Sequence, residues 1–355
     1  MILVQDCYEI RNTSAPESPW SIRFRRGTGG HMNNEKQIGY DIIGDVHGYA
    51  DKLEGLLRLM GYAQVDGTWQ HPERKAIFVG DLIDRGLRQV DSVMIAKRMV
   101  EGGHAHIVMG NHEFNAIAYA TPHPNKPGDF LRTHQGEWAA KNLEQHQKFL
   151  EAVVEGSELH REVIQWFKSI PLWLDLGGLR IIHACWDPAS MKRLLPKLGA
   201  NKTVTDELMV TMSTKGHEDY HDLEVLIKGP EIKMPDGFKY KDKDEIVRGS
   251  ARYAWWDPEA LTFDVAARIP DNCKAVDGTP FPQLPAVSIP SGNPAPYGDT
   301  IPLFFGHYWC TDKDEIISDH AMCVDYSAGK GGPLKAYRWN GESKLDPSVN
   351  LVSFP

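Results

Sequence analysis

Six residues with metal-ligating side chains directly follow apolar runs of the sequence. Each run has the composition of a short buried β-strand, and glycines beside these residues permit tight turns. Because open α/β sheets place their sites at the carboxyl ends of their strands, we expect the six side chains to meet. The candidate ligands are Asp45, His47, Asp81, Asn111, His183 and His307.

The chemistry of this set favours a pair of divalent cations. Carboxylate, imidazole and amide oxygen groups suit hard to borderline ions better than soft copper. Six ligands exceed the need of one tetrahedral ion, whereas a carboxylate that bridges two ions at about 3.5–4 Å is the arrangement of two-metal phosphoryl chemistry. The sequence therefore predicts a site for two divalent metal ions, with Mn favoured and Fe, Zn, Ni or Mg as alternatives.

The elements that must position these residues form an α/β pattern. Strands are expected at 40–43, 76–79, 106–109, 179–182, 303–305, 321–325 and 334–339. Helical spacing covers 53–60, 90–97 and much of 137–170, with Pro171 ending the last region. The alternation of strand and helix in the first third predicts βαβ units. Residues 190–300, charged in the middle and proline-rich at the end, are typical of an insertion.

Three sequence blocks resemble the signature motifs of the calcineurin-like metallophosphoesterases. They are Asp45-Val46-His47-Gly48, Gly80-Asp81 with Asp84-Arg85-Gly86, and Gly110-Asn111-His112-Glu113. The second block ends as in the branch of bacterial serine/threonine phosphoprotein phosphatases and diadenosine tetraphosphatases. The resemblance is firm over 40–113, reaches His183 and His307 as single residues, and does not cover 190–300. It implies a four-layer αββα sandwich of two mixed β-sheets flanked by helices, with a cap-like insertion.

The resemblance also implies how the metal ions are held. Asp45 and His47 would bind the first ion, and Asp81 would bridge the two ions. The second ion would be completed by Asn111, His183 and His307. A hydroxide between the ions would be the nucleophile, since two cations lower the pKa of bound water.

Three further residues receive catalytic roles from the same resemblance. His112 would be the general acid towards the leaving oxygen, and Asp84 would orient it and raise its basicity. Arg85 would clamp the phosphate with its planar guanidinium. Glu113 is expected to be structural or to support the ligands, and His146, in the helical region, is expected to be solvated.

Substrate contacts are less specified. Trp309 stands where many phosphodiesterases of the superfamily have another histidine, which favours monoester or pyrophosphate cleavage over cyclic diesters. No motif fixes an additional phosphate-binding arginine, for which Arg248 and Arg252 are candidates. Trp255 and Trp256 are most simply core residues, with a position at the substrate mouth as the alternative.

The favoured function is a two-metal-dependent phosphohydrolase that cleaves phosphomonoesters of small molecules or phosphoproteins. A dinucleoside polyphosphate or nucleotide hydrolase is the alternative enzyme. An inactive metal-binding scaffold is the alternative of another class, and it is disfavoured because every expected ligand, His112, Asp84 and Arg85 are present.

The whole chain of 355 residues sets broader limits. Its net charge of -9 argues against general nucleic-acid binding, and no apolar run reaches the length of a membrane span. The 5 cysteines form no CxxC pair and suit a cytoplasmic location.

Residues 1–31 are interpreted as a flexible tail or a remnant of an expression vector. Residues 32–355 are interpreted as a single domain with a helical insertion at 114–170 and a cap insertion at 190–300; the oligomeric state stays open.

Overall fold

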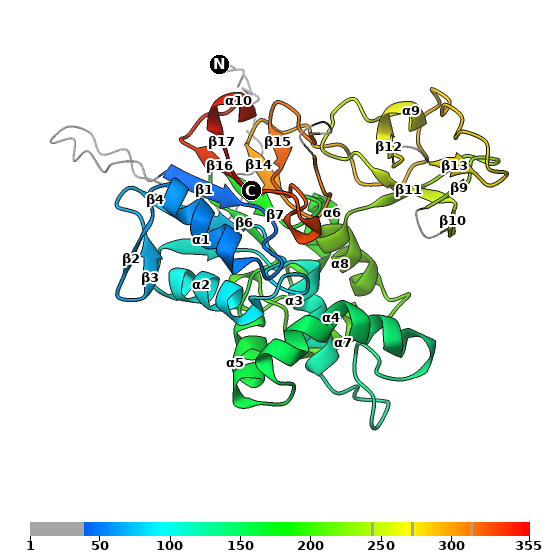
Figure 1. Ribbon diagram of the computed structural model, residues 1–355. Coiled ribbons are helices and arrows are strands. Elements are labelled where there is room, and N and C mark those ends of the chain that lie inside the picture. The colour runs from blue at the N-terminus through cyan, green and yellow to red at the C-terminus, as the bar shows by residue number, and fades with distance from the viewer. Residues whose placement is uncertain (1–38, 243–244, 271–272, 312, 314) are drawn as a thin grey trace, which may run out of the picture. The chain divides into compact units, whose positions relative to one another are not determined.

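The computed structural model describes residues 39–355 except 243–244, 271–272, 312 and 314 (Figure 1). All described residues belong to the compact unit that begins at Lys36. The interpretation of 1–31 as a tail concerns residues outside this range.

A five-stranded mixed sheet carries the first three motifs. Its strand order is β17-β16-β1-β4-β5, in which β1, β4 and β5 are parallel and the last two strands of the chain pair antiparallel. The buried apolar residues of the central strands, such as Ile42, Ile77 and Ile107, explain why they form the middle of a layer. The strands are β1 (Gly39–Ile43), β4 (Arg74–Phe78), β5 (Ala105–Ile107), β16 (Leu334–Trp339) and β17 (Leu351–Phe354).

A four-stranded mixed sheet carries the two later histidines. Its order is β15-β14-β7-β6, with β15, β14 and β7 parallel and β6 antiparallel to β7. The strands are β6 (Trp173–Asp175), β7 (Arg180–Ile182), β14 (Leu303–Phe305) and β15 (Ala321–Cys323). The expected fold class, mixed α/β sheets flanked by helices, is confirmed.

Two helices complete the predicted βαβ units. Helix α1 (Ala50–Leu59) buries Leu53, Leu56 and Leu57, the residues whose spacing predicted it. It packs against β16 and β17 and against helix α2 (Gln89–Glu101), and β2 (Ala63–Val65) and β3 (Thr68–Gln70) form a hairpin after α1 (Figure 1). These helices connect β1 to β4 and β4 to β5, so they set the parallel order that brings three motif-bearing strand ends together.

The helical insertion begins at the last motif. Helix α3 (Asn111–Ala120) starts at the candidate ligand Asn111, and α4 (Ala139–Val153) follows the short turn η1 (Gly136–Trp138). Helix α4 packs against α2, and α5 (Glu158–Phe167) packs against α3. The buried residues of α4 are spaced as one helical face: Asn142, His146, Phe149, Leu150 and Val153.

Residues 190–300 divide into a helical part and a part made of small sheets. The helical part contains α6 (Pro188–Leu194), η2 (Ala200–Lys202), α7 (Asp206–Met212) and α8 (Glu218–Lys228). Its buried Met209 and Leu226 join the same apolar cluster as the strands of the main sheets. The second part forms two three-stranded sheets, of orders β10-β9-β13 and β12-β11-β8.

The remaining elements are short. They are β8 (Glu231–Lys233), β9 (Tyr240–Lys241), β10 (Val247–Arg248), β11 (Ser250–Tyr253), α9 (Phe263–Ala266), β12 (Ala267–Arg268), β13 (Lys274–Ala275), η3 (Ala328–Lys330) and α10 (Pro347–Asn350). Within the part of the chain that the structure describes, no helix combines the length and apolarity needed to cross a bilayer.

Candidate metal and phosphate site

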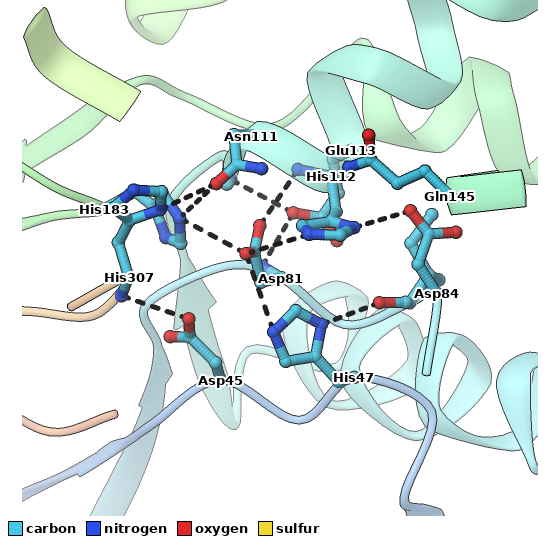
Figure 2. A network of polar contacts seen from close by, with 12 residues as sticks. Asp45, His47, Asp81, Asp84, Asn111, His112, Glu113, Gln145, His183 and His307 are labelled. Atoms are coloured by element: carbon cyan, nitrogen blue, oxygen red, sulfur yellow. Dashed lines mark hydrogen bonds and ion pairs between the residues drawn. The ribbon is translucent and has the colours of Figure 1, made fainter. Parts of the chain in front are cut away.

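The six candidate ligands follow the carboxyl ends of five strands from the two main sheets. Three of them adopt a left-handed backbone, with φ of 48° at His47, 52° at Asp81 and 71° at His307. Such conformations cost of order 1–3 kcal/mol each in non-glycine residues and persist only where the surrounding structure enforces them. The side chains of these three residues point towards the same site (Figure 2).

Two glycines are required by the closeness of this packing. A Cβ atom on Gly306 would lie 2.1 Å from Asp45 Oδ1, and a Cβ atom on Gly110 would lie 2.2 Å from Asp81 Oδ1. Neither distance is compatible with a side chain. The glycines next to the ligands therefore let the backbone approach the carboxylates.

Asp81 lies at the centre of the site (Figure 2). Its Oδ2 is 3.5 Å from His183 Nε2 and 3.8 Å from His47 Nε2. The same oxygen is 3.8 Å from His112 Nε2. A carboxylate shared between imidazoles from both sheets has the position that a bridging ligand needs.

Backbone carbonyls orient two of the histidines. His47 Nδ1 donates to the carbonyl of Ile83 at 2.9 Å, and His183 Nδ1 donates to the carbonyl of Val79 at 2.7 Å. Each bond orients the ring so that Nε2 faces Asp81. Asn111 Oδ1 lies 3.2 Å from His183 Nε2 and 2.9 Å from His307 Nδ1, so the three ligands expected for the second ion are in mutual contact.

The donor set fits divalent cations. Asp45 Oδ2 accepts the backbone N–H of His307 at 3.1 Å, but Asp45 Oδ1 is buried without a hydrogen-bond partner among the described residues. A buried carboxylate oxygen left unpaired is costly unless a ligand satisfies it. The described residues also contain two three-residue groups of metal-ligand geometry: His47, Asp81 and His112, and Asp81, His183 and His307.

The pKa shifts have the directions expected of crowded ligands. Burial, together with Asp325 and Asp81, raises the pKa of Asp45 well above its usual value. Burial and the neighbouring His112 lower the pKa of His47 to about 4, which keeps its imidazole neutral at pH 7. Burial opposes ionisation of Asp81, but His183 and His112 hold its pKa well below the usual range. A neutral His47 imidazole beside an ionised Asp81 carboxylate has the protonation states in which these two groups bind metal.

His112 is held by Asp84 on the side away from Asp81. Its Nδ1 lies 2.5 Å from Asp84 Oδ2, and burial of its ring is outweighed by Asp81 and Asp84, which raise its pKa to about 9. Asp84 itself is buried, but His146 and His112 lower its pKa to about 2. Glu113 accepts the backbone N–H groups of Asp81 and Leu82 at 2.8 and 2.7 Å, so it supports the loop of the second motif.

The expectation that His146 is solvated is wrong. Its ring is 2% exposed, and its Nδ1 lies 2.7 Å from Asp84 Oδ1. The signal was present in the sequence, because His146 precedes Phe149, Leu150 and Val153 by three, four and seven residues. A histidine on the buried face of an amphipathic helix needs a polar partner, and Asp84 is that partner.

A cavity of about 520 Å³ opens over this cluster. His47, Asp81, Asn111, His112 and His307 line it, and so does Arg85. Helix α4 contributes Lys141, Glu144 and Gln145 to the lining, whereas none of the described lining residues belongs to 190–300. The buried carboxylate of Asp325, which sequence reasoning did not single out, also lines the cavity; burial raises its pKa.

A larger cavity of about 930 Å³ lies beside the first and shares Trp309 and Lys330 with it. Of the four candidate substrate contacts, Arg248, Arg252 and Trp256 line this larger cavity. The guanidinium carbon of Arg252 lies 4.9 Å from the ring centre of Trp309, and Arg252 contributes to lowering the pKa of His307. Arg252 therefore stands where the two cavities meet.

Trp255 is instead a core residue. It is fully buried, is absent from the lining of both cavities, and donates its Nε1–H to the hydroxyl of Tyr308 at 3.0 Å. Trp256 packs on Tyr308 at 4.9 Å between ring centres. Of the two neighbouring tryptophans, only Trp256 reaches a cavity in the described structure.

Comparisons with known proteins show which family and which relatives this chain resembles. The model of the calcineurin-like phosphoesterase family matches residues 40–248. The chain is 33% identical over 150 residues to the asymmetrical bis(5'-nucleosyl)-tetraphosphatase PrpE of Bacillus velezensis, covering 41% of this chain and 56% of that protein. It is 30% identical over 150 residues to PrpE of Bacillus subtilis, covering 41% and 57%. The chain thus spans little more than half the length of these curated relatives.

A protein serine/threonine phosphatase of Saccharomyces cerevisiae aligns in structure with a TM-score of 0.43 at 14% identity, covering 91% of this chain and 81% of that one.

Proposed function

Because the chain belongs to the calcineurin-like phosphoesterase family, a family of hydrolases, we propose that it is a two-metal-dependent phosphohydrolase that cleaves phosphomonoesters. One observation carries the proposal: ionised Asp81 lies within 3.8 Å of the Nε2 atoms of His47, His112 and His183. Asp81 thus lies between two candidate metal ligands, His47 and His183, and His112. The other ring nitrogen of His112 is bonded to the carboxylate of Asp84.

Two groups of residues would hold the metal ions. Asp45, His47 and Asp81 form the first group, and Asp81, Asn111, His183 and His307 form the second. When bound, divalent cations lower the pKa of water and neutralise charge that develops on phosphoryl oxygens. The identity of the metal is part of the proposal, with manganese favoured by the carboxylate and amide oxygens.

His112 would donate a proton to the leaving oxygen from Nε2, the nitrogen directed into the cavity. Its other nitrogen donates to Asp84, which keeps the ring protonated and correctly oriented. Arg85 on the cavity wall would bind two phosphate oxygens through its planar guanidinium. His112 and Arg85 would contact the substrate, and Asp84 would act through His112. The metal ligands would hold the cations.

A second candidate function is hydrolysis of dinucleoside polyphosphates. It is supported by the name of the curated relatives and by the larger cavity, whose wall combines Trp256, Trp309 and Arg252. Aromatic faces stack on bases, and arginines bind phosphates, so a nucleoside and its phosphate chain suit this wall. A simple phosphomonoester would occupy the smaller cavity alone.

Turnover of two substrates tests both functions. The protein, loaded with Mn²⁺, is incubated with phenyl phosphate and with diadenosine tetraphosphate, and products are separated by chromatography. Release of inorganic phosphate from the first supports the monoesterase, whereas nucleotide products from the second at a higher kcat/KM support the alternative. The variant His112→Ala is the control: we expect turnover to fall by about 10²–10⁴-fold while metal content stays near that of the wild type. Absence of turnover with either substrate under several metals would contradict the proposal.

A further inference from the structure

Asp84 lies between two histidines from different parts of the chain. Its Oδ2 faces Nδ1 of His112 at 2.5 Å, and its Oδ1 faces Nδ1 of His146 at 2.7 Å. The side chain of Asp84 has no solvent exposure, and its backbone N–H donates to Gln89 Oε1 at 2.8 Å. Each carboxylate oxygen of Asp84 thus has its own imidazole partner.

The contact with His146 fixes which nitrogen of that ring carries a proton. An ionised carboxylate can only accept hydrogen bonds, so Nδ1 of His146 must donate. The ring is enclosed by Tyr119 and Phe149, at 5.6 and 4.9 Å between ring centres, and its Nε2 is buried without a partner among the described residues. The hydrogen bond to Asp84 is therefore the polar contact that the structure gives this buried ring.

Helix α4 brings His146 to Asp84 and also walls the metal cavity. The residues immediately before His146, Glu144 and Gln145, line that cavity, while His146 points to the inner side of the helix. A carboxylate with a single partner can rotate about its last bond. A second donor on the opposite oxygen removes that freedom and directs Oδ2 at His112.

We propose that His146 is a positioning residue for the general acid: by donating Nδ1–H to Asp84 Oδ1, it holds Asp84 in the orientation that keeps His112 Nδ1–H bound and His112 Nε2 directed into the cavity. This inference rests on the proposed function, because His112 affects turnover in this way only if it protonates the leaving oxygen. It assigns a role to the helical insertion that no motif indicates.

Substitutions of matched shape test the hydrogen bond. His146→Leu removes the donor, whereas His146→Asn has nearly the shape of leucine but keeps an N–H donor close to the position of Nδ1. We expect kcat for phenyl phosphate to fall about ten- to a hundredfold in His146→Leu, with KM changed less than threefold, and to recover most of that loss in His146→Asn. His160→Leu is the control, because His160 is buried against the same Phe149 and does not bond Asp84 in the described structure.

The leaving group separates positioning from general structural damage. Phenolate needs protonation as it leaves, whereas 2,4-dinitrophenolate does not, so the loss in His146→Leu should be at least fivefold smaller with 2,4-dinitrophenyl phosphate. Equal losses with both substrates, or no difference between the leucine and asparagine variants, would overturn the inference.

Should His146→Leu fail to fold, His146→Gln takes its place, since its donor is displaced from the Nδ1 position. Absence of wild-type turnover contradicts the proposed function itself, whereas a defect in His112→Ala with normal His146→Leu contradicts only this inference.

Discussion

The carboxylate of Asp84 shows how single residues in this site depend on burial and partners together. Burial by itself would keep Asp84 protonated, but two neighbouring imidazoles keep its pKa near 2. Asp81 and Asp84 raise the pKa of His112 to about 9 against the effect of burial, whereas burial and the neighbouring His112 lower the pKa of His47 to about 4. Three titratable groups within one cluster are therefore prepared for different tasks: a hydrogen-bond acceptor, a proton donor and a neutral ligand.

This pairing predicts how stability depends on pH. The pKa of Asp84 falls from 3.8 to about 2 on folding, so its contribution is fully present above about pH 5 and is lost as pH decreases through the native pKa. We expect the difference in unfolding free energy between metal-free wild type and Asp84→Asn to narrow by about 1 kcal/mol between pH 5 and pH 3. Urea unfolding at both pH values measures it. A difference that is constant or widens towards acid contradicts the assignment.

The turns that end the strands decide where the ligands point. The turn after β14 is a clear case, because Gly306 leaves no space for a side chain beside Asp45. The left-handed His307 follows at once, and its backbone N–H donates to Asp45. This turn therefore joins a residue of the four-stranded sheet to a ligand carried by the five-stranded sheet.

Adding one methyl group should break this junction. In Gly306→Ala the new Cβ would meet Asp45 Oδ1 at 2.1 Å, so Asp45 must move out of the first metal group. We expect metal content, measured by elemental analysis, to fall from about two ions towards one per chain, and turnover to fall at least a hundredfold. Gly298→Ala is the matched control, since nothing lies within 4 Å of its Cβ position. Full metal content in Gly306→Ala would show that the backbone can relax there.

At the scale of the whole molecule, the ligand set joins the two main sheets. Asp45, Asp81 and Asn111 follow strands of the five-stranded sheet, whereas His183 and His307 follow strands of the four-stranded sheet. Bound cations would thus add a connection between two layers that hydrogen bonds such as His307 N–H to Asp45 already join. Ligands that bind only the folded state increase its stability by mass action.

Removing metal should lower the thermal stability of the entire unit. At a free metal concentration a hundred times Kd, each bound ion contributes about 2.7 kcal/mol, so two ions correspond to a rise of roughly 8 °C in Tm for a chain of this size. We expect chelation to lower Tm by this amount, and added Mn²⁺ to restore both Tm and turnover. Calorimetry with and without chelator checks the shift. His183→Ala should reduce the shift, while an unchanged Tm on chelation would contradict metal binding between the sheets.

The main strands, the α/β class and the six candidate ligands could be predicted from the sequence, because each ligand follows a strand at short spacing and strand ends of parallel sheets share an edge. The resemblance of its local motifs also predicted catalytic roles for His112, Asp84 and Arg85. Only the tertiary structure decided that His146 bonds Asp84, that α4 walls the metal cavity, and that Trp256 rather than Trp255 lines the larger cavity. The physical reason is separation: Asp84 and His146 are 62 residues apart, and which face of a helix meets which strand end depends on packing between distant segments, which no short-range pattern records.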